Sequence, residues 1–234
     1  RIVDLSTGRT REMHQIHDDY AASFVVDEAR GFAMTVGYDG RLRKWSYPLW
    51  QLLEDLELTG ETLTSLAVNG STGVWCAGAE SGVVYRGTVS PFKMTGNLRL
   101  DNSPRVTKIR FDADGCCAAI GTGDGRVVIW SPQSGQKPTE VRVVKRSVRR
   151  LAWTSETEIL VGSDDGLIAR IDRSTLSTEA SLSGHPGPVA GLEDWPEEGV
   201  IVSVDRGGDL KIWDRERLVP LAGLRLSPDT VSEL

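Results

Sequence analysis

Apolar and polar residues alternate over residues 200–215, with one interruption at a pair of glycines. A period of two places successive side chains on opposite faces of an extended chain, so this stretch predicts two β-strands joined by a glycine turn. The second strand ends in Trp213 and Asp214. Residues 118–130 and 32–45 repeat the pattern, each with an Asp-Gly turn and a Trp at its end. The chain is therefore expected to be built from similar β-hairpins.

The turn glycines recur at nearly constant intervals of 42, 43, 41 and 42 residues. A fixed period in this range is typical of repeat proteins, in which each repeat is one supersecondary unit. Short apolar stretches between turn residues predict four strands per repeat and no long helix. Residues 49–58 have a near-helical leucine spacing, but their register with the other repeats favours an outer strand. The turn glycines are Gly40, Gly82, Gly125, Gly166 and Gly208.

We predict one continuous repeat domain over residues 1–226, followed by a C-terminal tail at residues 227–234. Counting back one period of 42 residues from Trp45 and Ser46, at the end of the first full repeat, puts the end of an additional repeat at Val3 and Asp4, so the chain begins with half a repeat. The expected repeats are approximately residues 1–17, 18–60, 61–102, 103–146, 147–185 and 186–226.

Repeats of this length, with a His near the start and Trp-Asp at the end, as at His185 and Trp213-Asp214, resemble the WD repeats of β-propellers. The resemblance extends from Arg1 to about Leu226. It implies an all-β propeller of four-stranded antiparallel blades, with five complete blades plus half a blade in this chain. We expect this to be part of a seven-bladed ring completed by upstream residues; a second polypeptide that supplies the missing strands and a contracted six-bladed closure are the alternatives.

The resemblance also implies a hydrogen-bonded tetrad in each blade: a His before the first strand, a Ser or Thr in the second, an Asp in the turn, and the Trp. Only the first full repeat fills all four places, and in the fifth Asp205 is a possible substitute for the missing turn carboxylate. A set that recurs with the blade period and includes Trp favours a structural role over a nucleophilic triad. The tetrad candidates are His17, Thr35, Asp39 and Trp45, then Asp124 and Trp130, then Asp165, then His185, Ser203 and Trp213.

In WD-repeat propellers, partners usually bind the top face, to which three positions per blade point. Tyr and Arg at these positions are enriched at binding hot spots, and Arg suits carboxylate or phosphate groups. An acidic or phosphorylated peptide is the expected ligand; simple solvation of the rim is the alternative. Carried over, the candidates are Tyr20, Tyr38, Thr62, Thr64, Glu80, Arg105, Thr107, Arg149, Asp164 and Arg206, with Ala22, Gly123, Ser147, Pro188 and Ala190 at the remaining positions.

The net charge of −6 gives no support to a general nucleic-acid role. The basic residues 142–150 alternate with valine and fit a strand, turn and strand with outward charges better than a lipid or nucleic-acid patch. No apolar run is long enough to span a membrane, and no signal peptide is recognisable. Cys76, Cys116 and Cys117 match no zinc spacing. All three are expected at the starts of inner strands as small buried residues in a reducing, intracellular compartment.

The sequence therefore predicts a non-catalytic scaffold or adaptor that binds protein or peptide partners on the propeller face within a multi-subunit assembly. It would lie in the cytoplasm or nucleus and need no cofactor and no metal. A phosphate-recognising module for nucleic acid or phosphoinositide is the alternative. An enzyme built on a propeller is a further one, but the sequence shows no cluster of His, Asp, Glu or Cys outside the periodic positions.

Overall fold

The computed structural model describes residues 2–3, 10–12 and 15–226, and every regular element in these ranges is a β-strand. They form five four-stranded antiparallel sheets, in which the strands pair in chain order, and one two-stranded sheet. This confirms the predicted all-β architecture of propeller blades. In the described part of the chain, no helix has the length and apolar content that a membrane crossing requires.

The sheets are referred to as blades one to five. Blade one contains β3 (Ala21–Asp27), β4 (Phe32–Gly37), β5 (Arg41–Ser46) and β6 (Leu52–Glu57). Blade two contains β7 (Leu63–Val68), β8 (Val74–Ala79), β9 (Val83–Val89) and β10 (Phe92–Arg99). Blade three contains β11 (Val106–Phe111), β12 (Ala118–Thr122), β13 (Arg126–Trp130) and β14 (Thr139–Arg142).

Blade four contains β15 (Val148–Trp153), β16 (Glu158–Ser163), β17 (Leu167–Asp172) and β18 (Thr178–Ser183). Blade five contains β19 (Val189–Trp195), β20 (Val200–Asp205), β21 (Asp209–Asp214) and β22 (Pro220–Arg225). The separate pair is β1 (Ile2–Val3) with β2 (Thr10–Glu12). Two predicted segments lie wholly or partly outside the described residues. They are the N-terminal half repeat, at residues 1, 4–9, 13 and 14, and the C-terminal tail, at residues 227–234.

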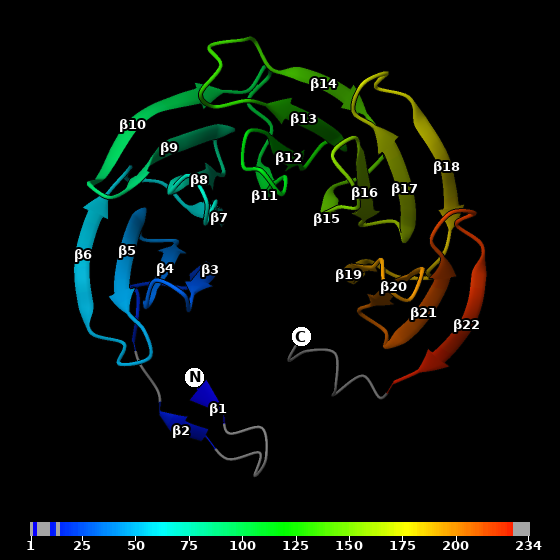
Figure 1. Ribbon diagram of the computed structural model, residues 1–234, viewed down its shortest axis with the longest axis horizontal. Coiled ribbons are helices and arrows are strands. Elements are labelled where there is room, and N and C mark those ends of the chain that lie inside the picture. Colours follow the sequence, from blue (N-terminus) through cyan, green and yellow to red (C-terminus); the bar gives the residue numbers. More distant parts are fainter. Residues whose placement is uncertain (1, 4–9, 13–14, 227–234) are drawn as a thin grey trace.

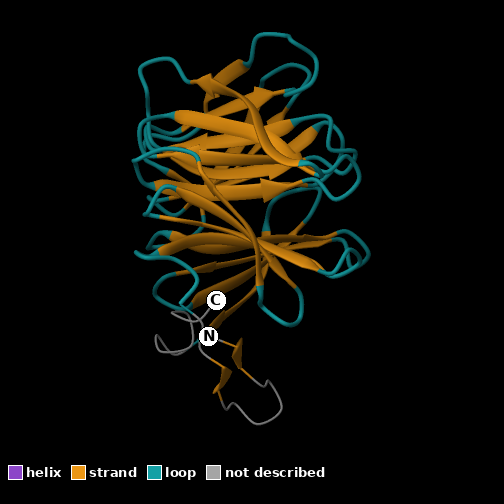
Figure 2. Ribbon diagram, turned by 90° about the vertical axis from the view of Figure 1, so that its left-hand side faces the viewer, coloured by secondary structure: helices purple, strands orange, loops and turns teal. Residues whose placement is uncertain are grey.

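The five blades stand around an arc, with their first strands innermost and their fourth strands at the periphery (Figure 1). The inner strands β3, β7, β11, β15 and β19 contact one another in that order. The arc is open between blades one and five, and β1 and β2 lie at this opening (Figure 1). Turned by 90°, the loops gather along two opposite sides of the molecule (Figure 2).

The recurring turn glycines are required by the backbone. Gly40 and Gly125 have φ angles of 73° and 88°, in the left-handed region that other residues rarely adopt. A Cβ atom at Gly40 would lie 1.9 Å from the carbonyl oxygen of Thr59, and one at Gly125 would lie 2.1 Å from that of Val144. Glycine is thus required both by the turn and by the chain segment that follows the fourth strand of the same blade.

The core lies between the blades. Met34 of blade one and Leu66 of blade two are fully buried in one cluster, and three further clusters join blades two to three, three to four, and four to five. Blade two has Gly87 where three other blades carry Trp. The indole of Trp75, on the neighbouring strand, fills this place: a Cβ at Gly87 would lie 2.2 Å from its Cζ2 atom. Blade two therefore keeps an aromatic core residue at a different position.

The fourth strand of blade two begins at Phe92, because the chain turns at residues 90–91 and pairs Phe92 directly with Val89. One of the sequence predictions for the cysteines is wrong. Cys116 is exposed and precedes its strand, whereas Cys76 and Cys117 are buried. The Asp112 carboxylate accepts the N–H of Cys117 at 3.0 Å and closes a turn in which Cys116 is exposed. Residues 52–57, by contrast, form the predicted outer strand.

Trp130→Ala should lower the free energy of unfolding by about 3–5 kcal/mol, because the indole is 7% exposed and belongs to the cluster between blades two and three. Urea denaturation measures the change. Arg206→Ala is the control: Arg206 is exposed, and its side chain has no hydrogen bond or ion pair with the side chains that the structure describes. Its effect should stay within about 0.5 kcal/mol. Equal urea midpoints for the two variants would refute this view of the core.

Candidate partner-binding face

One end of every blade combines the start of its first strand with the turn between its second and third strands. Antiparallel pairing brings these segments together: Ala21 pairs with Gly37 in blade one, and Val106 with Thr122 in blade three. We call this end of the blades the top face. The turns after the first and third strands lie at the opposite end, which we call the bottom face; there the N–H of Tyr47 binds the carbonyl oxygen of Gly31 at 2.9 Å.

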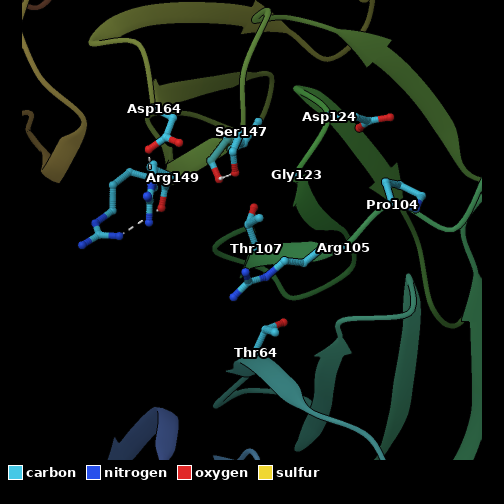
Figure 3. A pocket seen from close by; sticks show the side chains of 11 residues that line it. Thr64, Pro104, Arg105, Thr107, Gly123, Asp124, Ser147, Arg149 and Asp164 are labelled. Carbon is cyan, nitrogen blue, oxygen red and sulfur yellow. Dashed lines mark hydrogen bonds and ion pairs between the residues drawn. The ribbon is translucent and has the colours of Figure 1, made fainter.

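The structure gathers several of the predicted residues around one pocket on the top face, with a volume of about 540 Å³. Figure 3 shows Arg105, Thr107, Arg149 and Asp164 around it. Thr64, Gly123 and Ser147 also line the pocket. We call it the top-face pocket; it is bounded by blades two, three and four.

A second hollow of about 450 Å³ lies beside the top-face pocket and is lined by Tyr20 and Tyr38. Thr64 and Arg105 line both cavities, so the two are neighbours along the same face. The two Tyr rings meet edge to face with centroids 5.9 Å apart, and Tyr20 is 77% exposed. An exposed aromatic pair is a feature of binding surfaces more than of a merely solvated rim.

Three of the ten predicted partner-binding residues line neither cavity. Glu80 forms an ion pair with Arg105 at 3.6 Å, and its N–H binds the carbonyl oxygen of Thr62 at 3.0 Å. Both therefore lie next to the pocket. Arg206, in the turn after β20, is exposed on blade five and lies outside both linings.

Acidic side chains hold two arginines of the top-face pocket. The Nε–H of Arg149 donates to Asp164 at 2.6 Å, and Arg105 faces Glu80. Thr107 contributes a buried hydroxyl that has no hydrogen-bond partner among the described residues. Such a group carries a desolvation cost that a bound ligand could remove. Arg105 and Arg149 of the pocket are thus paired with surface carboxylates of the protein itself.

The tetrad of blade one is complete. The Nδ1 atom of His17 lies 2.8 Å from a carboxylate oxygen of Asp39, which can only accept, so Nδ1 carries the hydrogen. Nε2 therefore accepts from the hydroxyl of Thr35 at 2.9 Å, and that oxygen accepts the indole N–H of Trp45 at 2.9 Å. Burial opposes ionisation of Asp39, but hydrogen bonds from the Asp18 N–H, His17 and the Arg41 N–H hold its pKa below the usual value.

Blade five has only part of this network. His185 Nε2 lies 2.7 Å from the Ser203 hydroxyl, which accepts the Trp213 indole N–H at 2.8 Å. His185 Nδ1 is buried with no partner among the described residues. Asp205 does not substitute for the missing carboxylate, because it accepts the N–H groups of its own turn and of Gly187.

Blades three and four use a shorter motif that the sequence analysis missed. The hydroxyl of Thr122 donates to Asp124 at 2.6 Å, and Ser163 donates to Asp165 in the same way. Arg126 also binds Asp124, at 2.9 Å. The signal was available: a Ser or Thr stands three residues before the turn glycine and an Asp one residue before it. In the described ranges, no three His, Cys, Asp or Glu side chains gather closely enough to hold a metal ion.

Thr35→Val should destabilise the protein by about 1–3 kcal/mol, because it removes the shared hydroxyl and leaves the buried N–H of Trp45 and ring nitrogen of His17 unpaired. Thermal or urea unfolding measures this. Thr139→Val makes the same substitution on the exposed outer strand β14 and should change stability little. Similar losses in both variants would show that the network contributes nothing specific.

The pH dependence of the free energy of unfolding should also reflect the ionisation of His185. Burial lowers the pKa of His185, and Lys211 lowers it further, while Asp205 and Asp209 oppose the shift. The unfolded chain then binds a proton more readily than the folded one. The contribution of this group is complete above about pH 6.5 and is lost as the pH falls through the folded pKa. His185→Gln should reduce the loss of unfolding free energy between pH 7 and more acidic pH; an unchanged pH profile would contradict the argument.

Comparison with known proteins agrees with this architecture. The family model "WD domain, G-beta repeat" matches residues 92–131. The B-type cell cycle switch protein ccs52A of Medicago truncatula is 25% identical over 59% of this chain and 29% of its own length. WD repeat-containing protein srw1 of Schizosaccharomyces pombe is 28% identical over 50% of this chain and 21% of its own length.

WD repeat-containing protein SL1-17 of Schistosoma mansoni is 25% identical over 78% of this chain and 61% of its own length. The chain spans less than a third of the length of the first two relatives. These matches show WD-repeat sequence in this chain and similarity to WD-repeat proteins, and the five four-stranded sheets show β-propeller blade architecture.

Proposed function

We propose that this protein is a non-catalytic scaffold or adaptor that binds a protein or peptide partner on its top face within a larger assembly. The observation that carries the proposal is the pair of adjoining hollows, which bring Tyr20, Tyr38, Arg105 and Arg149 onto one surface. Tyr and Arg are the residues most enriched where binding energy concentrates. WD-repeat domains generally bind protein partners, so the fold supports the same function.

An acidic or phosphorylated segment is the partner chemistry that fits this surface. The ion pair of Arg105 with Glu80 is about half exposed, and such surface pairs stabilise by only about 0–1 kcal/mol. A carboxylate or phosphate from a partner could therefore take the place of the Glu80 carboxylate at little cost. Arg149 could exchange Asp164 in the same way and form two parallel hydrogen bonds to the ligand.

The open end of the arc supports completion of the ring by further blades. Phe24 of β3 is 68% exposed, whereas Leu66 and Ile109, at the same register in the next two blades, are fully buried. A large apolar side chain in this position needs a neighbouring sheet to cover it. We propose a seven-bladed ring with the domain over residues 1–226, its remaining blades supplied by the same polypeptide or by another.

An intracellular location is part of the proposal. Cys76, Cys116 and Cys117 are all free thiols, and two of them are buried. Unpaired cysteines of this kind suit a reducing compartment. The alternative function, recognition of phosphate in a nucleic acid or phosphoinositide, draws support from the same arginines and predicts a much steeper dependence of binding on salt.

The test is binding to an array of acidic, phosphorylated and neutral peptides at physiological salt. We expect selection of acidic or phosphorylated sequences, and loss of affinity by at least about tenfold in Tyr38→Ala and Arg105→Ala, which is about 1.4 kcal/mol. Tyr47→Ala and Arg30→Ala make the same changes on the bottom face and should bind normally. Equal losses in all four variants, or no preference among peptides, would overturn the proposal.

A further inference from the structure

A second group of cations lies on the inner strands. Lys108 and Arg110 of β11 and Arg150 of β15 line a cavity of about 360 Å³, together with Glu193 of β19. We call these three cations the inner-strand cluster. Figure 1 places β11, β15 and β19 side by side on the inner edge of the arc, and the first two and last two are in direct contact. The cavity is separate from the top-face pocket, although Arg150 borders both.

The inner-strand cluster is not neutralised by ion pairs. Among the side chains that the structure describes, no carboxylate lies within ion-pair distance of Lys108, Arg110 or Arg150. Within the described ranges, the guanidinium of Arg150 donates only to the carbonyl oxygen of its neighbour Arg149, at 3.0 Å. Arg105 and Arg149 of the top-face pocket, by contrast, have acidic partners.

The fold does not require these charges. Lys108 and Arg150 each follow the irregularity at the start of the inner strand, in matching register. Blades one and two carry Ser23 and Ser65 at this position, and blade five carries Gly191. Small uncharged residues therefore occupy the same backbone position in the other three blades. The two cations are a property of blades three and four rather than of the propeller blade in general.

The positive charge is also placed where it is costly. Burial lowers the pKa of Lys108 to about 8, with further lowering by Arg110 and Arg150 and partial opposition from Glu193. Burial likewise lowers the pKa of Arg150, and the charges of Arg110, Arg149 and Arg206 add to the effect. Lys108 and Arg150 are half-buried and share one nearby carboxylate. A bound anion would therefore stabilise their charges more than it would stabilise exposed cations.

We propose that the inner-strand cluster binds a compact, multivalent phosphate anion, such as a small polyphosphate. Arginine can form two parallel hydrogen bonds to a phosphate group, and lysine adds a mobile point charge. A volume of about 360 Å³ is within the range of small-ligand cavities and excludes a long polymer from being enclosed. Several unpaired cations against Glu193 match a multivalent anion better than a single carboxylate. The inference does not depend on the peptide partner proposed above.

Titration calorimetry of the purified protein with inorganic tripolyphosphate at physiological salt tests the proposal, with orthophosphate as the lower-charge comparison. We expect one saturable site and weaker binding of orthophosphate. The double variant Lys108→Ser and Arg150→Ser, which introduces the residue of blades one and two, should lower the affinity at least tenfold. Lys93→Ser with Arg99→Ser removes the same charge from exposed positions on β10 and should change the affinity less than twofold.

A second measurement separates a local site from general attraction and remains useful if the double variant folds poorly. An anion bound to Lys108 should raise the pKa of its amine, so binding near pH 8.5 should take up a proton, measured in buffers of different ionisation enthalpy. Lys108→Arg should bind the anion with less proton uptake. No saturable binding by the unmodified protein, equal losses in both double variants, or proton uptake unchanged in Lys108→Arg would each overturn the proposal.

Discussion

The structure depends on apolar packing between successive sheets. The main buried clusters draw residues from two consecutive blades, as with Met34 of blade one and Leu66 of blade two. Stability in such an array is the sum of blade and interface contributions, so each blade is stable chiefly because its neighbours cover it. The same packing holds the inner strands beside one another. Those strands carry the inner-strand cluster, and their first residues lie next to the turns after the second strands to form the top face. Packing between the blades therefore determines where these surface residues lie.

Because packing between blades provides the main stabilisation, the polar networks within blades can vary. Blade one has the complete chain from Trp45 through Thr35 and His17 to Asp39, whereas blades three and four replace it with a Thr-Asp or Ser-Asp hydrogen bond inside the turn. Both arrangements satisfy buried polar groups and fix the turn after the second strand. Blade two goes further and moves its indole to Trp75. The turn glycine is the feature that all five blades share.

The repeat period explains why so much of the fold could be predicted. Alternation is a weak signal in one strand, but five aligned copies placed even the near-helical residues 52–57 correctly in an outer strand. The failures came where local hydrogen bonds, not the period, decide the structure. The Asp112 turn that exposes Cys116 and the capping role of Asp205 depend on side-chain direction, which alternation does not report. The inner-strand cluster was missed because its members come close only when neighbouring blades pack together.

The top-face pocket and the inner-strand cluster differ in how their positive charges are paired, which the net charge of the chain does not report. The whole chain carries a charge of −6, which argues against broad attraction of polyanions. Arg105 and Arg149 of the top face are paired with Glu80 and Asp164, and the proposed partner would have to displace those carboxylates. Lys108 and Arg150 have no such partner to displace. Under the two proposals above, the top-face pocket exchanges its own carboxylates for those of a partner, whereas the inner-strand cluster holds a small anion that relieves the repulsion among its cations. An anion held there would also reduce the positive field at Arg150, which borders the top-face pocket, and would make that pocket less attractive to acidic partners.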